Sequence, residues 1–251
     1  MRSRNLLLIS LAILATCAAI TIAAFRDQAQ RKVGGQDAPD KSSWPLTDYT
    51  APRPTDPEER SRREARGRKY DKSDFRVHPQ DLAENTVRTQ SFDPYATLPA
   101  LPVIQSKAIV IGEVIAAQAY LSNDQTGVYS EFNIRVEEVL KTDGLEVPAT
   151  GCQIDLEREG GRVRFPSGRV HSYSVDKENM PRVGRRYIFF LTRENQEYTY
   201  HILTAYELRD ARVFPLDELP QFKSHQADNE LDFITTLRRL VGASSQRGGD
   251  K

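Results

Sequence analysis

The sequence predicts a mainly β protein, a small closed or partly open β-barrel with a C-terminal α-helix. Segments of β-branched and aromatic residues between about residues 107 and 214 alternate with period two, and no helical pattern separates them. Residues 231–241 instead carry apolar side chains at helical spacing. We expect an N-terminal membrane helix and a disordered linker to precede the barrel.

The composition places part of the chain outside any core. Of 251 residues 39% are hydrophobic, and the mean hydropathy is −0.56. Lysine plus arginine equals aspartate plus glutamate at 35 each, so the net charge gives no global attraction to nucleic acid. Two cysteines, Cys17 and Cys152, are too few for a disulfide framework. We expect Cys152 to be a small buried side chain rather than a reactive thiol.

Residues 1–25 form a predicted signal-anchor or signal peptide. Arg2 and Arg4 precede an uncharged apolar run, Leu6 to Phe25, whose length as a helix is about 30 Å. The run is longer than a usual secretory signal and lacks a good cleavage site, which favours an uncleaved anchor. We expect a single-pass protein with an extracytoplasmic C-terminal domain. The alternative is a secreted or periplasmic protein after cleavage.

Residues 26–90 are predicted to form a largely disordered stalk, because they combine mixed charges and six prolines with no apolar periodicity. Asp56 and Pro57 have the order of a helix cap and first turn, which predicts a short helix through about Tyr70. Basic side chains crowd this helix: Arg60, Arg62, Arg63, Arg66, Arg68 and Lys69. A solvated spacer is favoured over a contact with anionic lipid or nucleic acid, because acidic residues dilute the cluster.

The folded domain is expected to span residues 91–242. Lys107–Ala117 is predicted to form a buried strand with a bend or bulge at Gly112. In the next strand, Val128–Lys141, alternate positions predict one core face and one wet face, and the pair Glu137-Glu138 indicates a bulge. The core face holds Val128, Ser130, Phe132, Ile134 and Val136, and the wet face holds Tyr129, Glu131, Asn133, Arg135 and Glu137.

Further strands are predicted at residues 152–157, 162–165, 186–194, 198–208 and 212–214. Asp228 is expected to cap the final helix, which would end at Gly242 and precede a disordered tail, residues 243–251. The apolar stripe of this helix is Leu231, Ile234, Leu237 and Val241.

Three stretches in this order carry a resemblance to a known family: residues 108–114 (AIVIGEV), 132–141 (FNIRVEEVLK) and 183–191 (VGRRYIFFL). They resemble exported bacterial proteins with an OB-fold, netrin-module-like β-barrel of the kind found in metalloproteinase inhibitors. The resemblance covers about a third of the chain. It implies an OB-like barrel and transfers no active residue. The metal-binding N-terminal cysteine of those inhibitors has no equivalent before the first strand.

No catalytic residue, cofactor or metal ligand is predicted. The histidines His78, His171, His201 and His225 lack the spacing of a zinc site. No nucleophile elbow or phosphate loop is present. The acidic residues Glu113, Glu131, Asp155 and Glu157 are interpreted as the wet face of strands, although they could pair in three dimensions.

These features favour a non-catalytic envelope binding or scaffolding module, membrane-anchored or secreted, with a protein partner in the envelope. The loops at residues 118–127 and 171–185 are the expected contact surfaces. One alternative is an extracytoplasmic enzyme or inhibitor, which His171 or His201 beside a carboxylate would indicate. OB-type oligonucleotide binding is least favoured, because export and the scarcity of aromatic-basic stripes oppose it.

Overall fold

The computed structural model describes residues 41–78, 87–90, 97–142, 149–193 and 199–247. The predicted membrane segment lies outside this range, and so does the first part of the predicted stalk. Within the described residues, no helix has both the length and the apolar character needed to cross a membrane.

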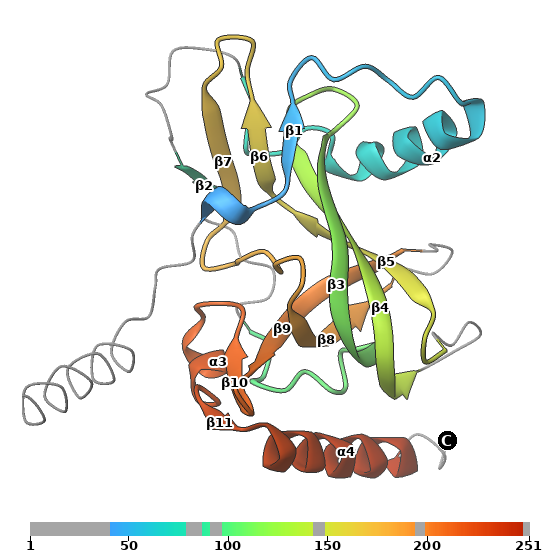
Figure 1. Ribbon diagram of the computed structural model, residues 1–251, viewed down its shortest axis with the longest axis vertical. Helices are drawn as coiled ribbons and strands as arrows, with labels where there is room; N and C mark the ends of the chain where they lie inside the picture. The colour runs from blue at the N-terminus through green and yellow to red at the C-terminus, as the bar shows by residue number, and fades with distance from the viewer. Residues whose placement is uncertain (1–40, 79–86, 91–96, 143–148, 194–198, 248–251) are drawn as a thin grey trace, which may run out of the picture. The chain divides into compact units, whose positions relative to one another are not determined.

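The mainly β prediction is confirmed by a ring of strands in the described part of the chain (Figure 1). Neighbours around the ring pair in the order β3-β4-β5-β9-β8, and β8 pairs with β3 again. All these pairs are antiparallel except β5–β9, a short parallel contact, so the ring is only partly closed. The strands are β3 (Ala108–Leu121), β4 (Val128–Thr142), β5 (Gln153–Glu159), β8 (Arg186–Thr192) and β9 (Tyr200–Arg209).

A smaller second sheet was only partly predicted. Its order is β1-β6-β7-β2, and only β6 (Gly161–Arg164) corresponds to an expected strand. The others are β1 (Leu46–Asp48), β2 (Val87–Gln90) and β7 (Val170–Val175). Two further strands, β10 (Arg212–Pro215) and β11 (Asp228–Asn229), extend the ring sheet from β9. A short helix, α3 (Pro220–Lys223), lies between them in the sequence.

The predicted bend and bulge are one irregularity in the β3–β4 pair. Ile111 pairs with Glu138 and Gly112 pairs with Val136, so Glu137 is the extra residue. A side chain at Gly112 would lie 2.7 Å from the backbone oxygen of Arg135. Glycine therefore permits the close approach of the two strands at the bulge.

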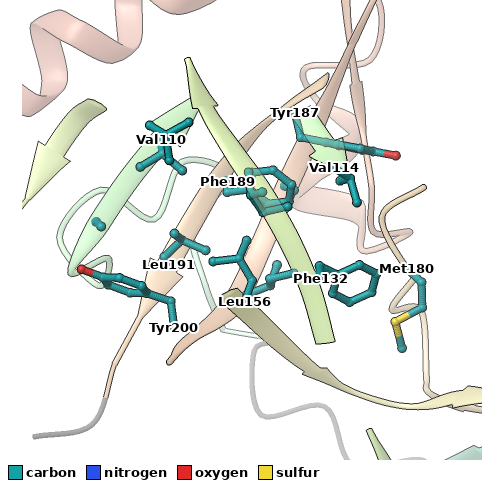
Figure 2. Packing of buried hydrophobic residues seen from close by; sticks show 14 of the residues in the cluster. Val110, Val114, Phe132, Leu156, Met180, Tyr187, Phe189, Leu191 and Tyr200 are labelled. Carbon is teal, nitrogen blue, oxygen red and sulfur yellow. The ribbon is translucent and has the colours of Figure 1, made fainter. Parts of the chain in front are cut away.

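Alternate side chains of the ring strands fill its interior, as Figure 2 shows around Phe132, Leu156 and Phe189. The predicted core face of β4 is confirmed, because Val128, Phe132, Ile134 and Val136 are all buried. On the wet face Tyr129 is also buried, so the prediction is wrong for that residue.

The C-terminal helix, α4 (Glu230–Arg247), is confirmed, but both predicted ends are wrong. The side chain of Asn229, rather than Asp228, accepts from the Leu231 and Asp232 amides at 3.0 and 3.2 Å. The helix also continues through Gly242, since a glycine costs a helix only about 1 kcal/mol. Part of the predicted tail is therefore helical. The face that packs on the barrel consists of Phe233, Ile234 and Leu237, with Val241 partly buried.

The prediction of a disordered stalk is wrong for residues 41–78. These residues include β1, which pairs with β6, and the helices η1 (Lys41–Ser43), α2 (Pro57–Gly67) and η2 (Arg68–Tyr70). Few apolar side chains occur here, but four of them are inserted into the folded unit: Trp44, Tyr70, Phe75 and Val77 are buried. Burial of a few large side chains thus orders a segment of polar composition.

Cys152 is exposed, which contradicts its predicted burial. It follows Gly151, whose φ of +86° marks the turn that enters β5. The Cys152 amide donates to the Ala149 oxygen at 3.0 Å, so the residue belongs to the turn rather than to the core-facing part of the strand.

Candidate functional site

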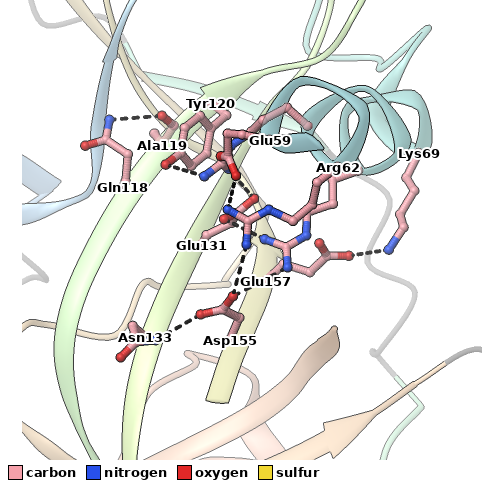
Figure 3. Close-up of polar contacts among 12 residues, drawn as sticks. Glu59, Arg62, Lys69, Gln118, Ala119, Tyr120, Glu131, Asn133, Asp155 and Glu157 are labelled. Carbon is pink, nitrogen blue, oxygen red and sulfur yellow. Dashed lines mark hydrogen bonds and ion pairs between the residues drawn. The ribbon is translucent and has the colours of Figure 1, made fainter. Parts of the chain in front are cut away.

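The helix α2 lies across the outer faces of β4 and β5 (Figure 3). It begins as predicted: the Asp56 carboxylate accepts from the Glu59 amide at 2.8 Å, and Pro57 occupies the first turn. The helix contributes no large apolar side chain, and its buried residues are Arg66 and Gly67. Polar contacts must therefore hold it on the barrel.

Three acidic side chains lie beneath the helix, and we call Glu131, Asp155 and Glu157 the carboxylate face. Glu131 lies on β4 and the other two on β5, where Glu131 pairs in register with Glu157. Asn133 pairs with Asp155, and its side-chain amide donates to the Asp155 carboxylate at 2.9 Å. Carboxylates at adjacent positions of paired strands repel one another unless cations neutralise them.

The arginines of α2 supply these cations. Arg66 Nη1 lies 2.7 Å from Glu131 Oε2, and Arg66 Nη2 lies 3.5 Å from the Asp155 carboxylate. Arg63 also pairs with Glu131, and it donates to the Tyr120 hydroxyl at 2.7 Å. Its guanidinium carbon lies 3.4 Å from the centre of the Tyr120 ring. The side chains of Arg66 and Glu131 are each 11% exposed, so this pair is largely removed from water.

Glu157 is the most buried member of the carboxylate face, with a side chain 0% exposed. Its Oε1 accepts from Lys69 Nζ and from His201 Nε2, both at 2.8 Å. Burial alone would raise the pKa of Glu157, but the hydrogen bonds from His201 and Lys69 outweigh it and leave the pKa lowered. In the part of the chain that the structure describes, Glu157 Oε2 and Asn133 Oδ1 are buried without a hydrogen-bond partner.

The C-terminal end of α2 is fixed by close packing. A side chain at Gly67 would lie 2.5 Å from the Asn123 side-chain oxygen, and Asn123 donates to the Glu64 backbone oxygen at 2.9 Å. Asp124 in the same turn accepts from the Lys72 amide at 2.8 Å. The segment 118–127, predicted as a free contact loop, is thus the end of β3 and a turn packed against the helix.

The second predicted contact loop, residues 171–185, is also largely ordered within the fold. It starts in β7 and continues through Glu178 and Asn179, which are buried around Arg158. Arg158 pairs with the carboxylates of Glu178 at 3.0 Å and Asp217 at 2.9 Å. Burial alone would lower the pKa of Arg158, but Asp217 and Glu178 outweigh it and raise the pKa. This cluster joins β5 to the segment that follows β7 and to the segment that follows β10.

The remaining candidate residues lie elsewhere. Glu113 pairs with Arg135, outside the carboxylate face. His171 lies in the second sheet, 5.0 Å from the Phe165 ring. Neither of its ring nitrogens has a hydrogen-bond partner among the residues that the structure describes. No group of three or more potential metal ligands occurs among the described residues. Of the histidines considered, His201 lies beside the carboxylate face.

The basic side chains of α2 and η2 were predicted to be solvated, but three of them bind the carboxylate face. Arg63, Arg66 and Lys69 are three residues apart, which places them on one side of a helix. Glu131 and Asn133 on one strand, and Asp155 and Glu157 on the next, show the alternation of a polar strand face. The two patterns together are a signal for a helix bound to a strand face by charge.

Fold and site define a mainly β protein with a partly closed barrel whose acidic outer face carries a basic helix. No protein-family model matches the chain, and a search of curated proteins gives no significant match.

Proposed function

We propose that this protein is a non-catalytic binding or scaffolding module of the cell envelope, and that its contact surface is the carboxylate face. The observation that carries the proposal is the ion-pair attachment of α2, in which Arg66 bridges Glu131 and Asp155. A purely structural helix normally buries an apolar stripe, as α4 does with Phe233 and Leu237. Complementary charge is the usual basis of specificity at a recognition surface.

The strand order supports an OB-like barrel and the likeness to exported netrin-module-like domains. An OB-fold is a five-stranded, partly open barrel that binds ligands on the face of its second and third strands. The corresponding strands of this ring are β4 and β5, which carry the carboxylate face. Likeness of fold alone does not imply a function, so the proposed binding function rests on the charges of the site.

We further propose that residues 1–25 anchor the protein, with its N-terminus in the cytoplasm and residues 41–247 outside. The uncharged run behind Arg2 and Arg4 supports this orientation. Added protease should digest the folded unit in cells whose outer layer has been opened. Protection of the folded unit in such cells would contradict the orientation. A shortened N-terminus on the isolated protein would indicate the alternative, a secreted or periplasmic product.

Cross-linking in intact membranes followed by affinity isolation tests the binding function. The wild type is compared with Glu131→Gln/Asp155→Asn, which removes two charges of the carboxylate face. Glu113→Gln is the matched control, because Glu113 is a strand carboxylate paired with Arg135. A partner should be recovered with the wild type and the control and lost with the double variant. Equal recovery in all three, or recovery in none, would contradict the proposal.

A second candidate is an enzyme, which the contact between His201 Nε2 and Glu157 favours. A buried carboxylate that orients a histidine is an arrangement used in general acid–base catalysis. Lys69 shares the same carboxylate oxygen, which favours an ion-pair network over a base held for a substrate. Hydrolysis of a panel of ester, peptide and glycoside substrates by the wild type, lost in His201→Gln, would support this candidate.

A further inference from the structure

We propose that α2 is a displaceable occupant of the carboxylate face, and that an arginine-bearing helix of a partner protein takes its place. This inference rests on the function proposed above, because it specifies the chemistry of the partner. The partner would present cationic side chains three residues apart, as Arg63, Arg66 and Lys69 do.

The attachment of α2 depends mainly on its charged side chains. Toward its N-terminus, Arg60 donates to the backbone oxygens of Pro54 and Thr55, within its own segment. Among the described residues, the main contacts of α2 with the barrel are the ion pairs of Arg63 and Arg66 and the Tyr120 contact of Arg63. Asn123 adds one hydrogen bond to the Glu64 backbone oxygen. The pair of Arg66 and Glu131 is largely removed from water, so Glu131 must keep a cationic partner, whether that is α2 or a segment that replaces it. A second segment with the same charges would therefore compete with α2 on similar terms.

The chain geometry allows α2 to leave without disturbing the barrel. Residues 50–56, which connect β1 to the helix, are exposed apart from the half-buried Pro54. At the other end, Tyr70 stacks on Tyr129 and keeps the segment attached. The helix and Lys69 can thus separate by a rotation at Tyr70 that breaks the hydrogen bond from Asn123 to Glu64, while β1 stays paired with β6.

The carboxylate face requires a cationic replacement. Glu131 is 11% exposed beneath the helix, and Glu157 is fully buried. A carboxylate removed from water and left unpaired is costly, so an apolar or acidic partner would be rejected. The charge of the face selects for a segment that supplies guanidinium or ammonium groups in the same places.

The unused acceptors on this face indicate that arginine fits it better than lysine. Glu157 Oε2 and Asn133 Oδ1 are buried and have no donor from the described residues. Lys69 reaches Glu157 through a single nitrogen at Oε1. A guanidinium group at this position can donate to both carboxylate oxygens. A partner helix with arginine in place of Lys69 would therefore form one more hydrogen bond with Glu157 than Lys69 does.

A labelled peptide with the sequence of residues 56–69 is the probe, added to the full chain in detergent micelles. Arg63→Ser/Arg66→Ser in the protein frees the face and should raise peptide affinity at least about tenfold over the wild type. Adding Glu131→Gln to this variant should reverse the gain. A peptide with Lys69→Arg should bind several-fold more tightly. Equal affinity for the wild type and the double variant, or no effect of Glu131→Gln, would overturn the proposal.

The wild type provides a test that does not depend on the folding of variants. Excess Lys69→Arg peptide should speed hydrogen exchange of the amides in α2 and leave β4 unchanged. A peptide with glutamine at positions 63 and 66 is the control and should have no effect. Unchanged α2 exchange overturns displacement. If membrane cross-linking still recovers a partner that needs Glu131, the binding function stands and only the arginine-helix inference fails.

Discussion

Tyr70 stacks on Tyr129, with ring centroids 4.5 Å apart and ring planes inclined by 11°. Tyr70 belongs to a segment that sequence composition predicts to be disordered, and Tyr129 belongs to the predicted wet face of β4. Their contact removes both rings from water and fixes the C-terminal end of α2 on the barrel. Residues of the predicted stalk thus form part of the folded unit.

Replacement of Arg158 should be strongly destabilising. Arg158→Met leaves Glu178 and Asp217 buried without their cation, which should cost about 3–5 kcal/mol in the free energy of unfolding. Urea denaturation of the folded unit measures this change. Arg164→Met is the control, because Arg164 forms an exposed pair with Asp48 and should change stability by less than about 1 kcal/mol. Equal losses of unfolding free energy in both variants would contradict the stabilising effect assigned to the buried Arg158 pairs.

Two leucines of α4 test how the helix docks. Leu237 is 0% exposed, so Leu237→Asp should lower the free energy of unfolding by at least about 3 kcal/mol. Leu231 is 69% exposed in the first turn, where an added carboxylate favours the helix N-terminus. Leu231→Asp should therefore leave thermal stability nearly unchanged. Similar melting temperatures for the two variants would show that α4 does not pack as described.

Acid should destabilise the fold through His171. Burial, followed by the charges of Arg88 and Arg169, lowers the pKa of His171 in the folded state. The unfolded state binds the proton more readily, so stability should be constant above about pH 6.5 and decrease as the pH falls below it. His171→Phe should remove this part of the pH dependence in thermal melts. His225→Gln, at a partly exposed histidine paired with Asp228, should retain it. An unchanged pH profile in His171→Phe would be evidence against this account.

The ring strands were predictable because each strand carries its own signal. In β4 the alternation of Phe132, Ile134 and Val136 with polar residues fixes a core face without reference to the rest of the chain. The start of α2 was predictable for the same reason, since Asp56 and Pro57 act locally. The strand β7 was missed, because its sequence mixes serines and a histidine with only a few apolar residues.

The candidate site could not be predicted, because its contacts join distant parts of the chain. Arg66 and Glu131 are each ordinary surface residues in sequence terms, and only strand register brings Glu131 beside Glu157. The predicted solvated spacer is a reasonable interpretation of a helix without apolar residues. It fails for α2 because the partner surface is itself charged, a property that no local pattern in residues 57–70 reveals.

The salt dependence of hydrogen exchange in α2 tests the central claim most directly. If ion pairs hold the helix on the carboxylate face, amides of residues 57–67 should exchange faster as salt rises from about 50 mM to about 500 mM. Amides of β4 and α4, which apolar packing protects, should keep their rates over the same range. Exchange in α2 that is as slow as in β4 and does not respond to salt would contradict the account.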